Sequence, residues 1–218
     1  MIKLISKILD FIYPPICGVC KKIDKNSLCN KCEKILKENS VFGIDNYEQD
    51  EKNFDEHLYI FMYQGIIRKM ILNYKFNDRA YLYKTFVNFL LKNEKFVEKI
   101  RFYDIIIPVS LHRKREKQRG YNQSALIAEE LGKNLKIPVN KECLYKTKNV
   151  IPQSSLSKEE REINIKDAYV LKNSQKLIEK KVLLIDDIYT TGNTADECSK
   201  TIKKANINKI GILTIAKD

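Results

Sequence analysis

The run KVLLIDDIYTTGNT at residues 181–194 constrains the fold of this chain more than any other stretch. Its first half is continuously apolar and ends in two adjacent carboxylates, Asp186 and Asp187. Such an apolar run is typical of a central strand of a parallel sheet, which is buried on both faces. The second half is rich in hydroxyls, carries Gly192 and leads into residues 195–198, which have helical character. The run therefore predicts a strand, a tight loop and a helix start, and ligands bind at this carboxyl edge of open parallel sheets.

The loop after the acid pair has the residue types that bind a sugar phosphate. Backbone N–H groups of residues 191–194 would lie at a helix N-terminus, where an anionic phosphate is favoured. Gly192 lets the backbone approach a ligand closely. The two carboxylates could accept hydrogen bonds from a sugar diol or hold a hard cation such as Mg²⁺. A phosphate site beside a diol site describes a ribose 5-phosphate, and the candidate residues are Asp186, Asp187, Thr190, Thr191, Gly192, Asn193 and Thr194.

Two other interpretations of this run fit less well. A strand that ends in an N-capping loop with solvated aspartates explains neither the adjacent carboxylates nor the three threonines around one glycine. A Walker A loop is excluded because its lysine is absent from the run.

Four of the six cysteines form two C-x-x-C pairs near the start of the chain, and the pairs are eight residues apart. Two such pairs can close a tetrahedral thiolate site around Zn²⁺, although the spacing between them is shorter than the usual template. A redox dithiol would need only one pair. We therefore predict structural zinc on Cys17, Cys20, Cys29 and Cys32. The segment is too small to form its own hydrophobic core, so the metal would supply its stability.

A second apolar strand, at residues 104–109, leads into a strongly basic segment that we expect to be a loop. Five cations against Glu116 suit the backbone of a nucleic acid or a pyrophosphate, and the alternative is a solvated charge run. We predict that single-stranded DNA binds here, on Arg113, Lys114, Arg115, Lys117 and Arg119. His112 could contact an anion or a metal, or be an exposed spectator.

The formal net charge of +12 is distributed unevenly. Residues 45–56 hold six acidic side chains against one lysine, so the other residues together are more basic than the total suggests. A basic surface indicates a polyanionic partner, with nucleic acid first, although a lysine-rich proteome gives the same composition. No apolar run approaches the ~20 residues of a membrane span. With no signal peptide, we expect a cytoplasmic protein without disulfides.

Alternating strand and helix patterns along the chain predict an α/β fold with a parallel sheet flanked by helices. The expected strands are 57–63, 142–146, 168–171 and 209–216, besides the two above, and the expected helices are 2–12, 64–74, 80–99 and 122–134. Residues 40–56 are expected to form an acidic connecting loop, and residues 148–164 a polar segment. We divide the chain into a helix and zinc module at residues 1–40 and a sheet domain at residues 41–218.

The run at residues 181–194 closely resembles the phosphoribosyl-pyrophosphate (PRPP) loop of type I phosphoribosyltransferases. The whole chain resembles the ComF family (ComFC-type competence proteins), which join an N-terminal zinc module to a phosphoribosyltransferase-like domain. The resemblance rests on residues 9–15, the paired cysteines, YQGIIR at 63–68, YKF at 74–76, PVSLHRKR at 108–115, RGYNQS at 119–124, Gln153, Arg161, Asn164, Ala168 and residues 186–194. Ser110 stands where the family usually has proline.

The resemblance implies roles for these residues. The acid pair would bind ribose and, indirectly, Mg²⁺, and the loop at residues 190–194 would hold the 5-phosphate. The pyrophosphate loop would be Ser110, Leu111, His112, Arg113, Lys114 and Arg115. The family also implies a role in natural transformation, in which the protein handles incoming single-stranded DNA beside a helicase-like ATPase.

Two function classes stay open. The first is a binding protein for PRPP, or a related ribose phosphate, and single-stranded DNA. The second is an active phosphoribosyltransferase that transfers ribose 5-phosphate from PRPP to a nitrogenous acceptor, with Mg²⁺ neutralising the leaving group. An enzyme of this kind needs a hood that selects the acceptor base. The sequence identifies none, and residues 40–63 are only a candidate.

Overall fold

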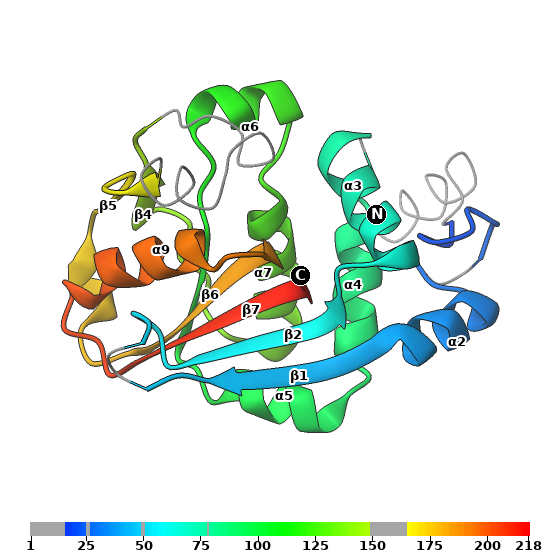
Figure 1. The fold of residues 1–218 in the computed structure, drawn as a ribbon, viewed down its shortest axis with the longest axis horizontal. Helices are drawn as coiled ribbons and strands as arrows, with labels where there is room; N and C mark the ends of the chain where they lie inside the picture. Colours follow the sequence, from blue (N-terminus) through cyan, green and yellow to red (C-terminus); the bar gives the residue numbers. More distant parts are fainter. Residues whose placement is uncertain (1–15, 25–26, 49–50, 78, 149–164) are drawn as a thin grey trace, which may run out of the picture.

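The structure is a computed structural model that describes residues 16–24, 27–48, 51–77, 79–148 and 165–218 (Figure 1). The strands are β1 (Ser40–Asn46), β2 (Glu56–Met62), β3 (Ile105–Pro108), β4 (Leu144–Lys146), β5 (Tyr169–Leu171), β6 (Lys181–Tyr189) and β7 (Lys209–Lys217). The helices are α2 (Asn30–Asn39), α3 (Gly65–Phe76), α4 (Leu82–Leu90), α5 (Glu94–Arg101), α6 (Arg113–Arg119), α7 (Gln123–Leu135), the 3₁₀ turn η2 (Ser174–Leu177) and α9 (Asn193–Lys203).

The main sheet has five strands in the order β1-β2-β7-β6-β3. Strands β2, β7, β6 and β3 run parallel, and β1 pairs antiparallel with β2 at the edge. Strand β6 lies between β7 and β3, as its continuous apolar run predicted, and β4 and β5 form a separate two-stranded antiparallel sheet. The expected α/β fold class, with a mostly parallel sheet flanked by helices, is confirmed.

The two faces of the sheet belong to two apolar cores. Successive residues of a strand point to opposite faces, so Leu183 and Ile185 pack with α3, α4 and α7, while Val182 and Leu184 pack with α9 and the β4–β5 sheet. All four side chains are fully buried. Each such burial stabilises the fold by roughly 1.5–3 kcal/mol. In Figure 1, α9 lies on one side of the sheet, and α4 and α7 lie on the other.

Three segments differ from the sequence-based expectation. Residues 40–46, expected to lie in a loop, form the edge strand β1. The expected helix at 80–99 is two helices, because Asn93 caps α5 by accepting a hydrogen bond from the Phe96 amide at 3.0 Å. The basic segment forms the short helix α6 rather than a loop. The predicted helix at 2–12 and residues 149–164 of the polar segment lie outside the described residues.

The cysteine segment packs against the sheet domain through α4. Leu28 and Leu36 are buried in the same core as α3, α4 and α7. The Thr85 hydroxyl donates a hydrogen bond to the Ser27 carbonyl at 3.0 Å, and Asn88 Nδ2 donates to Ser27 Oγ at 2.9 Å. The segment therefore draws part of its stability from a shared core, in addition to any metal. The division of the chain after residue 40 stays a prediction.

Membrane-spanning geometry is absent from the described part of the chain: none of its helices combines the length and the apolar character needed to cross a bilayer.

Candidate functional site

Asp187 ends the face of β6 that carries Leu183 and Ile185, so its carboxylate points toward α3. There its Oδ1 lies 2.8 Å from the ammonium of Lys75, in the last turn of α3. Both side chains are mostly buried. The ion pair therefore fixes a negative charge and a positive charge together at the carboxyl edge of the sheet.

Asp186 lies in a different environment from its neighbour. Its Oδ1 accepts hydrogen bonds from Ser124 Oγ at 3.0 Å and from the Asp187 amide at 2.9 Å. Burial, and then the charge of Asp187, raise the pKa of the Asp186 carboxyl to about 7, while the Lys75 charge opposes this shift. A carboxyl group that titrates near neutrality can accept or release a proton under physiological conditions.

Lys146 at the end of β4 is a second partly buried cation, on the α9 side of the sheet. Its ammonium lies 5.2 Å from the centroid of the Tyr169 ring. Burial lowers the pKa of Lys146, and the nearby Arg115 charge lowers it further, while Cys198 and Asp186 oppose the shift. Asp186 is therefore within electrostatic range of both Lys75 and Lys146.

Gly192 sets the turn between β6 and α9. Its φ of +78° lies in the left-handed region that favours glycine. A Cβ at this position would also lie 2.3 Å from Tyr189 Oη, so the close contact excludes larger residues as well. The Gly192 carbonyl accepts the amide of Asp196 at 2.8 Å, which begins the helical hydrogen bonding of α9. The α9 N-terminus, with the positive end of its dipole, is thereby directed at this edge of the sheet.

A pocket of about 380 Å³ opens between this loop and α3. All seven residues predicted to bind the ribose phosphate line it: Asp186, Asp187, Thr190, Thr191, Gly192, Asn193 and Thr194. The opposite wall holds residues that sequence reasoning missed, among them Tyr63, Arg68, Leu72, Lys75 and Phe76. The motif YKF at 74–76 was noted as part of the resemblance, but nothing in the sequence assigned it to the acid pair.

The basic segment lies beside the pocket rather than in its wall. None of the described residues 110–115 lines the pocket. His112 caps α6, because its Nδ1 accepts the Lys114 amide at 3.3 Å. Arg113, Lys114 and Lys117 are exposed, whereas Arg115 and Arg119 are partly buried.

The RGYNQS motif at 119–124 joins α3, α7 and the acid pair. The Tyr74 hydroxyl donates to the Gln123 carbonyl at 2.8 Å, and the Tyr121 hydroxyl donates to the Tyr74 carbonyl. Asn122 caps α7 by accepting the Ser124 amide at 3.0 Å, which places the Ser124 hydroxyl on Asp186. Tyr121 is partly buried and packs against the core. The motif therefore connects α3 and α7 to the acid pair.

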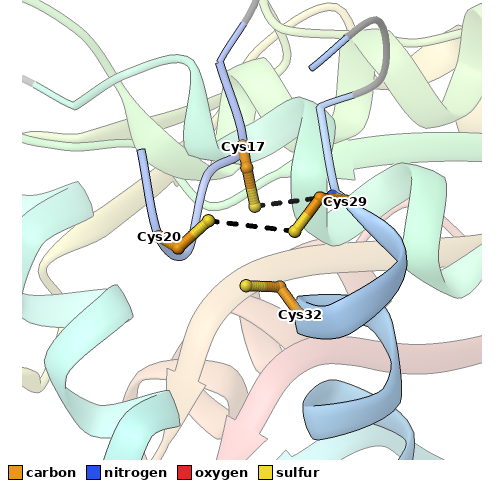
Figure 2. A group of neighbouring side chains, drawn as sticks. All are labelled: Cys17, Cys20, Cys29 and Cys32. Atoms are coloured by element: carbon orange, nitrogen blue, oxygen red, sulfur yellow. Dashed lines mark hydrogen bonds between the residues drawn. The ribbon is translucent and has the colours of Figure 1, made fainter. Parts of the chain in front are cut away.

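The four predicted metal ligands meet at one point (Figure 2). Their sulfur atoms all lie within 4.8 Å of one another, and the Sγ atoms of Cys20 and Cys29 are 3.8 Å apart. Zinc–sulfur bonds of 2.3 Å in a tetrahedron require sulfurs about 3.8 Å apart. The Cys29 amide donates to Cys17 Sγ at 3.5 Å, and such backbone contacts overcome the effect of burial and lower the pKa of Cys17 to about 7. The cluster fits a structural metal such as zinc.

Comparison with known proteins identifies competence proteins as relatives of the chain. No protein-family model matches it. Competence protein F of Haemophilus influenzae is 29% identical over 211 residues, which cover 89% of this chain and 92% of the relative. Over most of its length, the chain is similar to competence proteins of the ComF type. Competence protein ComFC of Streptococcus pneumoniae is 27% identical over 92% of this chain and 80% of the relative. A purine phosphoribosyltransferase from Pyrococcus horikoshii aligns with 63% of the chain and 84% of its own length, at 17% identity and a TM-score of 0.38.

Proposed function

We propose that this ComF-like protein binds PRPP or a related ribose phosphate at the carboxyl edge of β6, binds single-stranded DNA on its basic surface, and acts in DNA uptake during natural transformation. One observation carries the ribose-phosphate part. The acid pair, the Gly192 turn and the start of α9 line a single pocket. The names of two relatives, both competence proteins, support the part in DNA uptake.

In this proposal, each part of the pocket recognises one part of the ligand. The ribose hydroxyls donate hydrogen bonds to Asp186 and Asp187. The 5-phosphate binds the amides and hydroxyls of residues 190–194, where the α9 dipole favours an anion. Asp186 and Asp187 also offer the carboxylate oxygens that Mg²⁺ prefers. When bound, Mg²⁺ would neutralise the charge of the pyrophosphate.

The DNA part of the proposal rests on α6 and on the net charge of +12. The exposed cations Arg113, Lys114 and Lys117 would contact phosphates, with the partly buried Arg115 and Arg119 adding positive potential behind them. We further propose that the four-cysteine cluster holds zinc, and that the protein acts in the cytoplasm beside a competence ATPase.

Transfer of the ribose phosphate is a second candidate function, and the raised pKa of Asp186 favours it. A nitrogen nucleophile would form a bond to C1 of PRPP while the bond from C1 to the pyrophosphate oxygen breaks. Asp186 would accept the proton that the nitrogen loses.

Calorimetry with PRPP, with and without Mg²⁺, tests the site. The double variant Asp186→Asn/Asp187→Asn should lose PRPP binding and keep its fold, because both residues lie at a strand end. Asp104→Asn, an exposed carboxylate at the other end of the sheet, is the matched control and should bind as the wild type does. Equal PRPP affinity for the double variant and the control would refute the assignment. Release of pyrophosphate in a screen of nitrogenous acceptors would favour the transferase.

A further inference from the structure

One face of α3 forms the pocket wall opposite the loop at residues 190–194. Arg68, Leu72, Lys75 and Phe76 have the spacing i, i+4, i+7 and i+8, which places them on one side of a helix. Lys75 holds Asp187 at 2.8 Å. The next residue, Phe76, also lines the pocket, yet the residue is 66% exposed. The ion pair and an exposed aromatic ring are therefore joined through adjacent residues at the end of α3.

The Phe76 ring is held from one side by a cation. The guanidinium carbon of Arg119 lies 5.2 Å from the ring centroid, within the range of a cation–π contact. Arg119 is itself fixed, because its Nη1 donates to Gln123 Oε1 at 2.8 Å. Arg119 lies over one face of the ring, and Phe76 is 66% exposed, so ring surface remains for a second group. A flat group can stack there without moving the ring.

We infer that Phe76 is the stacking platform for a nucleobase, so that the pocket accepts a ribonucleoside 5′-phosphate as well as a bare ribose phosphate. The inference rests on the proposed ribose-phosphate site. The 5′-phosphate binds the α9 N-terminus, the ribose diol binds the acid pair, and the base lies on Phe76. Stacking on an aromatic ring tolerates any base, because every base has a π face. Recognition of the diol favours a ribonucleotide over a deoxyribonucleotide, which lacks the 2′-hydroxyl.

The test compares ribose 5-phosphate, AMP, CMP and deoxy-AMP by calorimetry. Stacking of one base should make AMP and CMP bind roughly 5- to 150-fold more tightly than ribose 5-phosphate. Phe76→Leu should lower the AMP affinity to about that of ribose 5-phosphate, and Phe76→Trp should keep the gain. Deoxy-AMP should bind more weakly than AMP.

Phe102 provides a matched control. Phe102 is 47% exposed, and the Lys181 ammonium lies 3.8 Å from its ring centroid. It lies before the amino end of β3, whereas the pocket is at the carboxyl ends of the strands. Phe102→Leu should leave the AMP affinity unchanged. If ribose 5-phosphate binds and AMP binds no more tightly, or if Phe76→Leu keeps the gain, the platform is wrong and the proposed function stands. If neither ligand binds, the ribose-phosphate site is wrong and the platform falls with it.

Discussion

The cysteine cluster and the acid-pair edge are built in opposite ways. All four cysteine ligands lie within residues 17–32, in two pairs whose spacing already suits one metal. The acid pair sits on one strand, but its partners Lys75 and Ser124 come from α3 and α7, far away in the sequence. The first site takes all its ligands from one short segment, although that segment also packs against α4. The second exists only after the helices have packed on the sheet.

The two regions therefore differ in what stabilises them. In isolated zinc modules, metal binding provides roughly 10–16 kcal/mol of apparent free energy at one point. The acid-pair edge depends on many contacts of roughly 0.5–3 kcal/mol each, such as the bond from Ser124 to Asp186 and the Lys75 ion pair. Loss of a metal ligand should hence affect folding more than any single change at the edge.

Cys29→Ser tests this contrast with the largest expected effect. It should abolish metal binding and lower the free energy of unfolding by more than about 4 kcal/mol. Because Leu28 and Leu36 share the core with α4, hydrogen exchange should rise in α4 as well as in residues 16–32, while β6 stays protected. Elemental analysis, thermal unfolding and hydrogen exchange measure these effects.

The control for this change is Cys143→Ala, which removes a buried cysteine far from the cluster. It should keep the metal and cost much less stability. Wild-type protein that holds no metal when purified without chelator would contradict the prediction, and so would full metal content in Cys29→Ser.

The difference between the regions also explains what the sequence predicted. The cysteines and the acid pair are local patterns, so their positions could be read directly. The partners of the acid pair could not, because only helix packing brings Lys75 to Asp187. Phe76 was missed for the same reason.

Two secondary-structure errors have equally local causes. Helix α6 contains only charged and polar residues, so it has no apolar periodicity to reveal it. Strand β1 alternates weakly, and Gly43 interrupts it where the Tyr59 ring comes close. Both elements owe their structure to caps or neighbouring strands rather than to a pattern of their own.

Lys75→Met should show how far the edge depends on one long-range contact. It leaves the Asp187 carboxylate mostly buried and without its ion pair. The loss of a fully buried pair costs about 3–5 kcal/mol, so a destabilisation of roughly 2–3 kcal/mol is expected here, together with weaker PRPP binding. Lys69→Met removes the same charge from an exposed position of α3 and is the control for urea unfolding. Equal stability of the two variants would show that the ion pair does not hold the edge together.

Asp186→Asn gives a smaller effect with a defined pH dependence. The pKa of Asp186 rises from 3.8 to about 7 on folding. Below pH 3.8 the carboxyl is neutral in both states, so it costs nothing. As the pH rises to about 7, the unfolded chain ionises more easily than the folded one, and stability is lost. The rise of the pKa from 3.8 to about 7 corresponds to about 4 kcal/mol near pH 8. Burying an asparagine amide in place of the carboxyl should offset about 1–3 kcal/mol of this. The variant should therefore be more stable than wild type near pH 8, on the order of 1–3 kcal/mol, and gain nothing near pH 4. An identical difference at both pH values would contradict this.

The smallest expected effect concerns the salt dependence of DNA binding. The experiment tests whether the basic surface of α6 is part of the acid-pair edge. Alanine at Arg113, Lys114 and Lys117 removes three exposed cations from α6. Single-strand binding weakens with salt at a log–log slope near −0.7 per phosphate neutralised, so the slope should flatten by about two units. The control replaces Lys95, Lys99 and Arg101, three exposed cations of α5. Helix α5 comes before the amino end of β3, whereas α6 follows its carboxyl end. The same loss of net charge from α5 should change the slope little.

Competition with PRPP decides how closely the two sites are joined. Because none of residues 110–115 lines the pocket, PRPP should leave the binding of DNA to α6 largely intact. Fluorescence anisotropy of a labelled single strand, titrated at several salt concentrations with and without PRPP, measures both properties. Displacement of the strand by PRPP would show that DNA reaches the pocket and that the two surfaces act as one. If the strand does not bind even at low salt, DNA is removed from the proposed function. Binding that depends on attraction between cations and phosphates is strongest at low salt.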